Sequence, residues 1–332
     1  ISYLRLSLTI SKCLDTHMNK TGHITYAYLE TTNYCNLDCS FCNRMDVIGP
    51  LKHMSLDNWQ KLLDGISHHP ITETKLMGMG EPMLHPQFDE VCRMFKETFP
   101  EAKIIVATNC QYKITEGGRF RKKFQEALKY IDMLYLSIDG WGEHYERDRA
   151  PARWKVLMKF LEDFRTIERH GCEVPINYVV NAYNVDDIPK VEGFVDEYKL
   201  DGIRLNIAQI WDENTSMSDD IATSGYSEEQ LKYLMDNYQD KIMGKSVWDF
   251  DDCFWVDKGL YVTVEGNVKV CCMNTGATPL GNLFTQHIDE IHRSPGYQAI
   301  KNGCKTKNPT EHCLNCSYKE LTPILSHLGV NN

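Results

Sequence analysis

Three cysteines lie close together in the chain, directly after a run of apolar residues that we expect to form a strand. They are Cys35, Cys39 and Cys42, and their spacing is CxxxCxxC. Three thiolates can hold three irons of a four-iron cluster and leave the fourth iron open to bind another molecule. Zinc is the alternative, but structural zinc prefers four ligands that usually come as two close pairs. The spacing therefore favours an incomplete iron–sulfur site.

Apolar runs and longer amphipathic stretches alternate over the middle of the chain. The apolar runs predict strands at residues 26–29, 73–77, 104–107, 133–138, 176–180 and 203–207. The amphipathic stretches predict helices at residues 55–66, 87–98, 120–128, 153–170 and 185–198, and Ser55 is a suitable N-cap. This alternation predicts an α/β fold with a parallel sheet, whose functional site lies at the carboxyl ends of the strands.

The pattern changes after residue 212, which predicts more than one structural unit. Residues 1–212 are expected to form the core. Residues 213–250 are expected to form a polar linker or lid with a helix near residues 228–238, and residues 251–332 a cysteine-bearing auxiliary domain. Within this last region, residues 260–264 and 268–270 flank a turn at Gly266 and Asn267 and predict a β-hairpin.

Composition argues against several classes of partner. The formal net charge of −10 argues against a broad nucleic-acid-binding surface, and no apolar run is long enough to predict a membrane span. A short basic group is expected to be a solvated helix face, and it consists of Arg119, Arg121, Lys122 and Lys123. Thirteen cysteines without a secretion signal indicate metal ligation in a reducing cytoplasm rather than disulfides.

The cysteine triad and a later segment together resemble the radical S-adenosylmethionine (SAM) superfamily. The first segment is Cys35-Asn-Leu-Asp-Cys39-Ser-Phe-Cys42, with the aromatic Phe41 before the last cysteine. The second is Met79-Gly80-Glu81-Pro82, which resembles the family's GGEP segment with Met in place of the first Gly. In the family this loop contacts the amino group of SAM, and a glycine beside an acid allows that close approach. The resemblance implies four cofactor-binding residues: Phe41, Gly80, Glu81 and Pro82.

Further matches follow the third and fourth predicted strands. Thr108-Asn109-Cys110 stands where relatives commonly have Thr-Asn-Gly, and Ser137-Ile138-Asp139-Gly140 resembles the segment that reaches the ribose and methionine parts of SAM. Arg149 resembles the arginine that pairs with the SAM carboxylate, with Arg147 and Arg153 as alternatives. A turn hydroxyl and a surface guanidinium remain the alternative interpretation for Ser137 and for these arginines. The resemblance adds four cofactor-binding residues: Asn109, Ser137, Asp139 and Arg149.

The resemblance implies both a fold and a chemistry. The fold is a partial (β/α)6, TIM-like barrel with a small C-terminal α+β auxiliary iron–sulfur domain. In the chemistry, a 4Fe–4S cluster binds SAM, one electron cleaves the S–C5′ bond, and the 5′-deoxyadenosyl radical abstracts a hydrogen atom from the substrate. The protein must hold the reacting carbon close to the cofactor and exclude water. A flavodoxin- or ferredoxin-type protein is the implied electron donor.

A second group of cysteines lies near the C-terminus. Cys253, Gly266 and Cys271 have the spacing Cys-x12-Gly-x4-Cys, and Cys313 and Cys316 form a CxxC pair. This pattern resembles the SPASM/twitch subgroup in its shorter twitch form. It implies one auxiliary 4Fe–4S cluster held by Cys253, Cys271, Cys313 and Cys316, with zinc in the same site as the alternative. Cys272 is an alternative to Cys271 because neighbouring strand residues face opposite sides, and Cys304 is a further candidate ligand.

The remaining cysteines are of two kinds. Cys13, Cys92 and Cys172 are expected to be ordinary buried thiols. Cys110 follows the third strand near the expected cofactor, where a thiol can give a hydrogen atom to a substrate radical, as in radical epimerases. Its alternative role is that of a small side chain in the place of glycine.

The substrate does not follow from the fold. Relatives in this subgroup either modify ribosomally made peptides by cross-linking, epimerisation or backbone rearrangement, or oxidise small molecules such as aminocyclitols, sugars and nucleotides. We expect the peptide class, with a small-molecule dehydrogenase or epimerase as the alternative. About thirty residues precede Cys35, so we expect a separate peptide-recognition protein. A non-enzymatic, metal-stabilised binding module would use the same cysteines but would not need Gly-Glu-Pro after the second strand.

Overall fold

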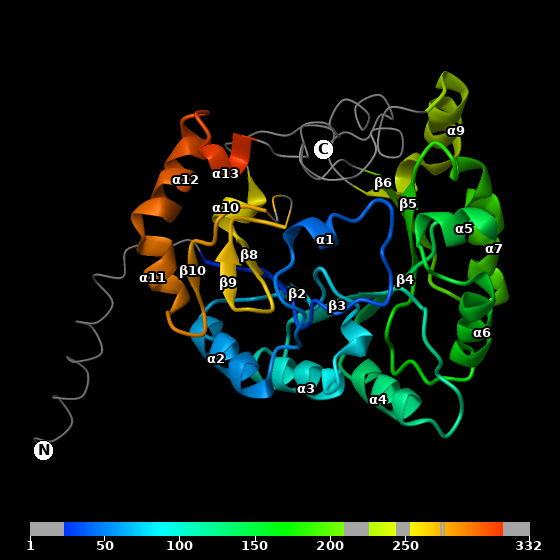
Figure 1. The fold of residues 1–332 in the computed structure, drawn as a ribbon, viewed down its shortest axis with the longest axis horizontal. Helices are drawn as coiled ribbons and strands as arrows, with labels where there is room; N and C mark the ends of the chain where they lie inside the picture. Colours follow the sequence, from blue (N-terminus) through cyan, green and yellow to red (C-terminus); the bar gives the residue numbers. More distant parts are fainter. Residues whose placement is uncertain (1–22, 209–225, 244–252, 273, 275, 315–332) are drawn as a thin grey trace, which may run out of the picture.

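The chain folds around one continuous ten-stranded sheet, seen in a computed structural model that describes residues 23–208, 226–243, 253–272, 274 and 276–314. The strand order is β10-β9-β8-β1-β2-β3-β4-β5-β6-β7. All neighbouring pairs from β8 to β7 are parallel, and only the pairs that involve β9 are antiparallel. Figure 1 shows the sheet curving around the loop that carries α1, with helices on its outer side.

Six βα units form the barrel part of this sheet. Its strands are β1 (Tyr26–Leu29), β2 (Glu73–Lys75), β3 (Lys103–Thr108), β4 (Met133–Ser137), β5 (Ile176–Val180) and β6 (Ile203–Ile207). Its helices are α1 (Arg44–Val47), α2 (Leu56–Ile66), α3 (Phe88–Thr98), α4 (Arg119–Leu128), α5 (Glu143–Asp148), α6 (Trp154–Phe164) and α7 (Ile188–Glu197). The 3-10 turns η1 (Pro82–Leu84) and η2 (Val185–Asp187) precede α3 and α7. The predicted partial (β/α)6 barrel is therefore confirmed.

The two edges of the barrel sheet are extended by later parts of the chain. After β6 come α9 (Glu228–Tyr238), η3 (Gln239–Lys241) and the short strand β7 (Ile242–Met243), which pairs with β6. The C-terminal region contains α10 (Phe254–Asp257), β8 (Gly259–Val262), β9 (Asn267–Lys269), β10 (Gly281–Asn282), α11 (Ile288–Arg293), α12 (Pro295–Lys305) and α13 (Glu311–Leu314). No helix within the described ranges is both long enough and apolar enough to cross a bilayer.

The predicted hairpin forms, and it is joined directly to the barrel. β8 pairs with β9, and Gly266 occupies the turn with a φ of +80°. On its other side β8 pairs with β1 in parallel, from Tyr26 opposite Gly259 to Leu29 opposite Val262. The residues before the cysteine triad and the residues before Cys271 are therefore held in one sheet.

The expected solvated face on α4 is confirmed for Arg119 and Lys122, which are exposed, and wrong for Arg121 and Lys123. Arg121 and Lys123 are not on a solvated face: the Arg121 guanidinium donates to the carbonyls of Ile114, Asp163 and Thr166. Lys123 Nζ donates to the carbonyls of Met83 and His85. The helix expected over residues 153–170 ends at Phe164 instead, and two of the carbonyls near its end accept from Arg121.

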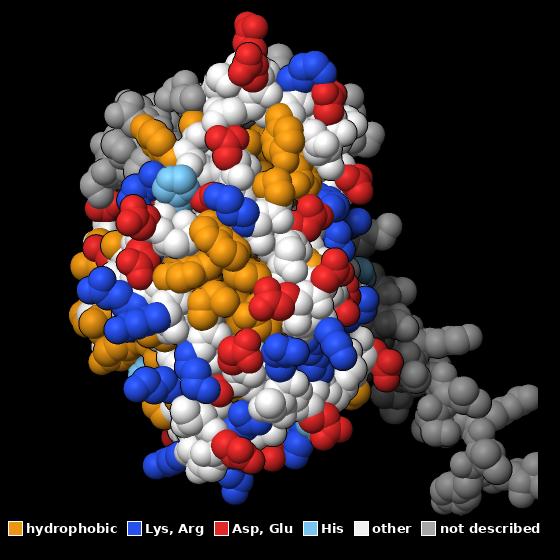
Figure 2. All heavy atoms as spheres, turned by 90° about the vertical axis from the view of Figure 1, so that its right-hand side faces the viewer, with side chains coloured by type: hydrophobic (Ala, Val, Ile, Leu, Met, Phe, Trp, Pro, Cys, Tyr) orange, Lys and Arg blue, Asp and Glu red, His pale blue; other side chains and the backbone are white. Residues whose placement is uncertain are grey.

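Aromatic rings fix the outer helices α5, α6 and α7 to one another. Trp141 precedes α5 and lies 5.0 Å from Trp154 of α6 and 5.2 Å from Phe194 of α7, measured between ring centroids. Figure 2 shows the side of the molecule that carries these helices, where hydrophobic side chains gather within a rim of charged ones. Trp141 remains 38% exposed, so its stacking is only partly buried.

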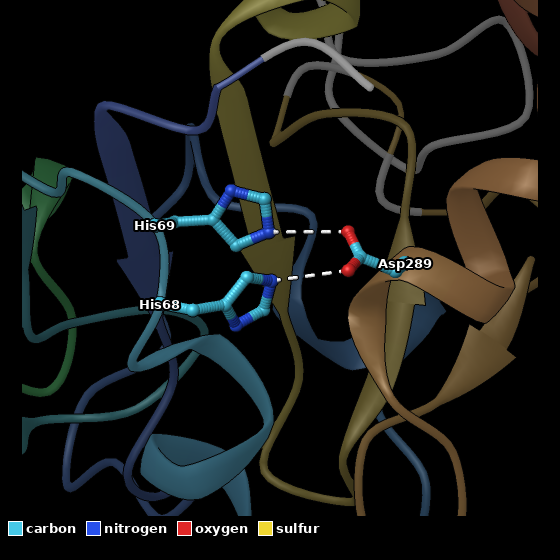
Figure 3. Close-up of side chains that lie close together, drawn as sticks. All are labelled: His68, His69 and Asp289. Carbon is cyan, nitrogen blue, oxygen red and sulfur yellow. Dashed lines mark ion pairs between the residues drawn. The ribbon is translucent and has the colours of Figure 1, made fainter. Parts of the chain in front are cut away.

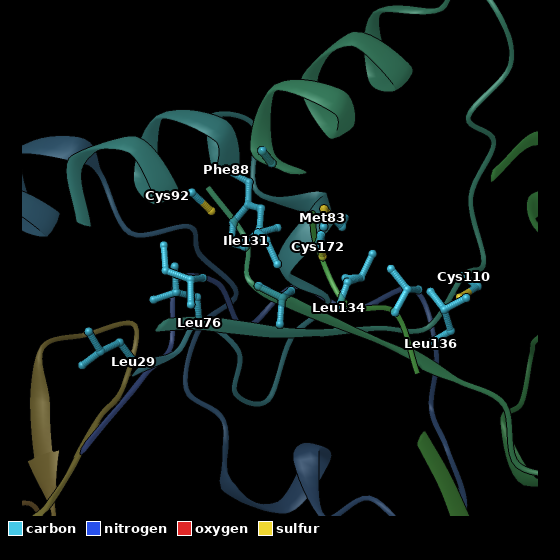
Figure 4. Packing of buried hydrophobic residues seen from close by; sticks show 14 of the residues in the cluster. Leu29, Leu76, Met83, Phe88, Cys92, Cys110, Ile131, Leu134, Leu136 and Cys172 are labelled. Atoms are coloured by element: carbon cyan, nitrogen blue, oxygen red, sulfur yellow. The ribbon is translucent and has the colours of Figure 1, made fainter. Parts of the chain in front are cut away.

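The main core lies between the sheet and the outer helices. Figure 4 shows part of it, which includes Phe88 and Cys92 of α3 together with Leu76, Leu134 and Leu136 of the sheet side. Cys92 and Cys172 are buried in this cluster, which confirms that they are ordinary buried thiols. Cys13 and Cys316 lie outside the described residues.

A polar cluster of His68, His69 and Asp289 joins the barrel to α11 (Figure 3). Asp289 Oδ2 lies 3.2 Å from His68 Nε2, and Asp289 Oδ1 lies 3.6 Å from His69 Nε2. The backbone N–H of Ile24 donates to His69 Nδ1. Burial lowers the pKa of His69 to about 4, so the neutral ring keeps its single proton on Nε2, facing Asp289. At 3.6 Å the contact with Asp289 Oδ1 is electrostatic and too long for a hydrogen bond.

Lowering the pH from 7 to 5 is expected to destabilise the apoprotein through His85. Its Nε2 donates to Met54 O and its Nδ1 accepts from Gln87 N–H, so the buried ring has no place for a second proton. Burial lowers its pKa from 6.5 to about 4. The unfolded state therefore binds more protons as the pH falls, and folding loses about 2 kcal/mol by pH 5.

Chemical denaturation of wild-type protein and His85→Gln at both pH values tests this. The stability gap between the two proteins at pH 7 should shrink by about 2 kcal/mol at pH 5. His23→Gln is the matched control, because His23 is exposed. A gap for His85→Gln that stays constant between the two pH values would rule out a buried neutral His85.

Candidate functional site

The cysteine triad lies on the loop between β1 and α1, at the carboxyl end of the barrel strands. Cys35, Cys39 and Cys42 all line a cavity of about 170 Å³, and Cys42 N–H donates to Cys39 O at 3.0 Å. Burial raises the pKa of the Cys39 thiol to about 12, and the nearby Arg149 guanidinium opposes this shift. Arg44 also lowers the thiol pKa of Cys35 and Cys42 against the effect of burial. Two buried cations therefore favour the thiolate forms.

Most of the cofactor-binding residues expected from the sequence line this same cavity. They are Phe41, Gly80, Glu81, Asn109, Ser137 and Arg149. Three expected site residues do not line it: Pro82 begins the turn η1, Asp139 pairs with Arg149, and Cys110 lies in the core. Of the three candidate arginines, only Arg149 lines the cavity.

Gly80 lies where two backbone segments come into contact. A Cβ atom at this position would be 2.3 Å from Thr32 O and 2.7 Å from Tyr34 O, and these are backbone atoms that cannot move aside. The next residue, Glu81, donates its N–H to Tyr34 O at 2.7 Å. The glycine therefore allows the Gly-Glu-Pro loop to pack directly on the cysteine loop.

The Glu81 carboxylate is bound within the protein. Its Oε1 accepts from Thr108 Oγ1 at 2.7 Å and its Oε2 accepts from Asn109 N–H at 2.7 Å. Burial raises its pKa to about 7, and the bonds from Asn109 and Thr108 oppose this rise. Because Oε1 also accepts from Met83 N–H at 3.2 Å, Glu81 ties its loop to the end of β3 and keeps a lone pair for a bound ammonium on Oε2.

Glu30 is a buried site residue that the sequence patterns did not identify. At the end of β1, its Oε1 accepts from Met79 N–H at 2.6 Å and its Oε2 accepts from Val264 N–H at 2.9 Å. Burial raises its pKa, and these two backbone N–H groups oppose the rise. One carboxylate therefore connects the Gly-Glu-Pro loop to the hairpin of the C-terminal region.

Arg149 and Asp139 form a fully buried ion pair beside the triad. Arg149 Nε lies 2.5 Å from Asp139 Oδ2, and Asp139 Oδ1 accepts from Val179 N–H at 2.7 Å. The guanidinium also lies 5.4 Å from the centre of the Phe41 ring. Asp139 does not line the cavity itself, and its contact orients the Arg149 guanidinium that does.

Asn109 contacts the triad directly. Its side-chain amide donates to Asn36 Oδ1 at 2.8 Å and lies 3.8 Å from Cys35 Sγ. Hydrogen bonds to a ligating sulfur tune the potential of an iron–sulfur cluster.

The triad fits an iron–sulfur cluster better than a single zinc ion. Among the described side chains, only His68, His69 and Asp289 bring three ligand atoms within 4.8 Å of one another. Zinc–sulfur bonds of about 2.3 Å would draw three thiolates to within about 3.8 Å of each other. The wider arrangement, the cavity between the cysteines and the two buried arginines suit a larger, anionic group.

Cys110 lies in the core, where its Sγ donates to Thr108 O at 3.6 Å. Its thiol does not line the cysteine-lined cavity or the barrel cavity next to it, which is described below. Its φ is +59°, a conformation that favours glycine. This placement supports the small-side-chain alternative, and the hydrogen-donor role stays a prediction.

Cys110→Gly is expected to leave formation of modified substrate unchanged. Glycine relieves the positive φ and loses a small buried side chain, so the free energy of unfolding should change by less than about 1 kcal/mol. Cys110→Val is the contrasting variant, because a branched side chain at positive φ should destabilise the protein. A Cys110→Gly protein that releases 5′-deoxyadenosine but yields no modified substrate would instead establish the hydrogen-donor role.

A second cavity continues from the first into the barrel. It measures about 320 Å³ and shares Phe41, Met77 and Ala107 with the cysteine-lined cavity. Its other lining residues come from β1, β2, β4, β5, β6 and the end of β6: Tyr28, Lys75, Tyr135, Asn177, Val179, Arg204, Asn206, Ile207 and Ala208. A molecule in the barrel would therefore be in contact with a cofactor at the triad.

Cysteines of the C-terminal region gather in a second, smaller core. Cys271, Cys304 and Cys313 are buried there together, with Cys253 packed against them. Burial and the neighbouring Cys304 thiol raise the pKa of Cys313. Cys272 does not belong to this core and lies close enough to Tyr26, Tyr28 and Tyr261 to raise the pKa of each, although Cys271 also acts on Tyr261. The structure thus groups Cys271 rather than Cys272 with the other cysteines, and it adds Cys304.

Two segments of the chain match known protein families. Residues 29–195 match the radical SAM superfamily, and residues 253–317 match SPASM, an iron–sulfur cluster-binding domain. The first match covers the triad and the barrel to α7. The second covers every cysteine of the C-terminal group.

Curated relatives are similar over most of this chain. The antilisterial bacteriocin subtilosin biosynthesis protein AlbA of Bacillus subtilis is 22% identical over 323 residues, which cover 92% of this chain and 66% of that protein. The sporulation killing factor maturation protein SkfB of the same organism is 21% identical over 296 residues, with coverage of 84% and 67%. The chain thus spans about half to two thirds of the length of the curated relatives it matches.

A solved structure has the same fold. Streptococcus suis SuiB bound to its precursor peptide SuiA superimposes with a TM-score of 0.65 and 17% identity, over 84% of this chain and 67% of that chain. The family matches identify the cofactors as a SAM-binding 4Fe–4S cluster, SAM and an auxiliary iron–sulfur cluster. The chain belongs to the radical SAM superfamily and carries a C-terminal SPASM iron–sulfur cluster-binding domain.

Proposed function

We propose that this chain is a radical SAM enzyme that modifies a ribosomally made peptide. The observation that carries the proposal is the continuity of the two cavities through Phe41, Met77 and Ala107. Hydrogen abstraction requires the substrate carbon to be held against the cofactor. Because the two cavities share these three lining residues, a substrate in one can contact a cofactor in the other. The names of AlbA, SkfB and SuiB, which concern bacteriocin biosynthesis, maturation and a precursor peptide, support the peptide class.

Three cysteines would hold the SAM-binding cluster: Cys35, Cys39 and Cys42. When bound, cluster and SAM supply one-electron cleavage of SAM and hydrogen-atom abstraction from the substrate. Arg44 and Arg149 would stabilise the negative charge of the thiolates, and Arg149 would also pair with the SAM carboxylate. Gly80, Glu81 and Pro82 would form the loop beside the SAM amino group, while Asn109 and Ser137 contact the cofactor from the strand ends.

The auxiliary cluster would be held by Cys253, Cys271, Cys313 and Cys316. Because Cys304 is buried with three of these residues, it is the competing fourth ligand. Anaerobically reconstituted protein should hold about eight irons if both clusters form. Cys304→Ala should keep that number if Cys316 is the ligand and lose about four irons if Cys304 is, with Cys92→Ala as the buried-thiol control.

The partners of the reaction are part of the proposal. A flavodoxin- or ferredoxin-type protein would supply the electron, and a separate recognition protein would bind the leader part of the peptide. The test is co-expression of the chain with short peptides encoded beside its gene, followed by mass spectrometry. A mass change that requires Cys39 supports the proposal. An unmodified peptide, together with oxidation of a sugar or aminocyclitol by the same protein, would contradict it.

A further inference from the structure

Two cations line the barrel cavity, and neither forms an ion pair with a carboxylate of the described residues. Lys75 comes from β2 and Arg204 from β6, and both side chains are half-buried. None of the ion pairs in the described part of the chain includes either residue. None of the described residues that line this cavity is an Asp or Glu, although the chain as a whole has a net charge of −10. The described lining of the cavity is therefore positively charged, whereas the protein as a whole is negatively charged.

Aromatic side chains hold the two cations in place. Lys75 Nζ lies 5.9 Å from the ring centre of Tyr26 and 6.0 Å from that of Tyr28. Burial raises the pKa of Tyr135, and the nearby Arg204 guanidinium opposes this rise, so the two side chains lie close together. Glu73 precedes Lys75 on the same face of β2, but it neither lines the cavity nor pairs with Lys75. The contacts orient the cations without neutralising them.

A neighbouring amide completes a polar surface. Asn206 Nδ2 donates to Asn177 Oδ1 at 2.6 Å, and both residues line the cavity with Arg204. This bond leaves the Asn177 amide nitrogen as a donor for a bound group. Together, a guanidinium, an ammonium and an amide suit a carboxylate, since a guanidinium can bind both of its oxygens at once.

We propose that Lys75 and Arg204 bind the carboxylate of an Asp or Glu side chain of the peptide substrate. This inference rests on the proposed function, because the cavity shares Phe41, Met77 and Ala107 with the cofactor site. The acidic side chain would anchor the peptide inside the barrel and present a nearby carbon to SAM. The substrate class is thus a peptide with an acidic residue close to the modified one.

The test compares pools of short synthetic peptides on the reconstituted holoenzyme with SAM. Each pool has one fixed central residue, which is Glu, Asp, Gln or Asn, and uncharged residues elsewhere. Retained peptides are measured by affinity selection and mass spectrometry. We expect the Glu and Asp pools to be retained at least about tenfold over their amide counterparts.

Variants at the two cations connect this preference to the site. Lys75→Met and Arg204→Met should each abolish it, while Arg204→Lys, which keeps the charge, should retain part of it. Lys61→Met and Arg119→Met are matched controls, because both side chains are exposed outside the barrel. Equal retention of all pools, or an acidic preference that survives both substitutions, would overturn the inference and leave the proposed function standing.

Inorganic phosphate separates failure of the inference from failure of the proposed function. If no pool is retained while phosphate binds the wild type and not Lys75→Met or Arg204→Met, the anion belongs to a non-peptide substrate. That result would overturn the peptide assignment.

Discussion

Replacing Gly80 with alanine is expected to abolish SAM cleavage, with a loss of at least about a hundredfold in 5′-deoxyadenosine formation. The new Cβ would lie 2.3 Å from Thr32 O and 2.7 Å from Tyr34 O. Neither backbone atom can move without displacing the loop that carries the cysteine triad. We therefore expect both the Gly-Glu-Pro loop and the cysteine loop to shift, with loss of iron from the first cluster.

Gly193→Ala is the matched control for this substitution. Gly193 lies in α7, and a Cβ there would meet no atom within 4 Å. Alanine should raise the stability by up to about 1 kcal/mol, since it favours the helix. Iron content and 5′-deoxyadenosine are measured for both variants. A Gly80→Ala protein with normal iron and normal SAM cleavage would contradict the contact between the two loops.

Replacing Arg149 with methionine is expected to destabilise the protein by about 3–5 kcal/mol, because it leaves the Asp139 carboxylate buried without its partner. Asp139 is completely buried and Arg149 is 6% exposed, so water cannot replace the lost contact. The same change removes the cation nearest Cys39, which should also weaken cluster binding. Urea unfolding of the apoprotein measures the first effect and iron content the second.

A double variant separates charge from packing. Arg149→Met combined with Asp139→Asn should lose less stability than Arg149→Met alone, since the amide carries no charge and still accepts from Val179 N–H. Arg165→Met is the control: its partner Glu162 is 3.8 Å away and exposed, so the cost should be below about 0.5 kcal/mol. If Arg149→Met were as stable as Arg165→Met, the buried Arg149–Asp139 pair would contribute nothing to the free energy of unfolding.

The parts of the site that are local in sequence could be predicted from the sequence. The three cysteines, Gly80 and Glu81 lie in short segments directly after strands, and parallel strands bring their carboxyl ends to one edge. Six strands and their helices follow from apolar periodicity. The helix expected over 153–170 ends at Phe164, where Asp163 O and Thr166 O accept from Arg121, a residue more than forty positions away in sequence.

The parts that depend on long-range pairing could not be predicted in this way. β8 adds to β1 across more than two hundred residues, and only this pairing brings Val264 N–H to Glu30. Cys304 is only one further candidate ligand in the sequence, and its place in one core with Cys271 and Cys313 depends on the folded C-terminal region. Lys75 and Arg204 lie on separate strands, and they line the same cavity only because the sheet curves into a barrel.

The most direct test of the account is SAM cleavage by the triad. Wild-type protein, reconstituted anaerobically with iron and sulfide and then reduced, is incubated with SAM, and 5′-deoxyadenosine is quantified. The wild type and Cys92→Ala should release it, and a Cys35→Ala, Cys39→Ala, Cys42→Ala triple variant should release none while keeping the auxiliary cluster. Release by the triple variant, or a wild-type protein that holds one zinc and leaves SAM intact, would contradict the assignment of the triad.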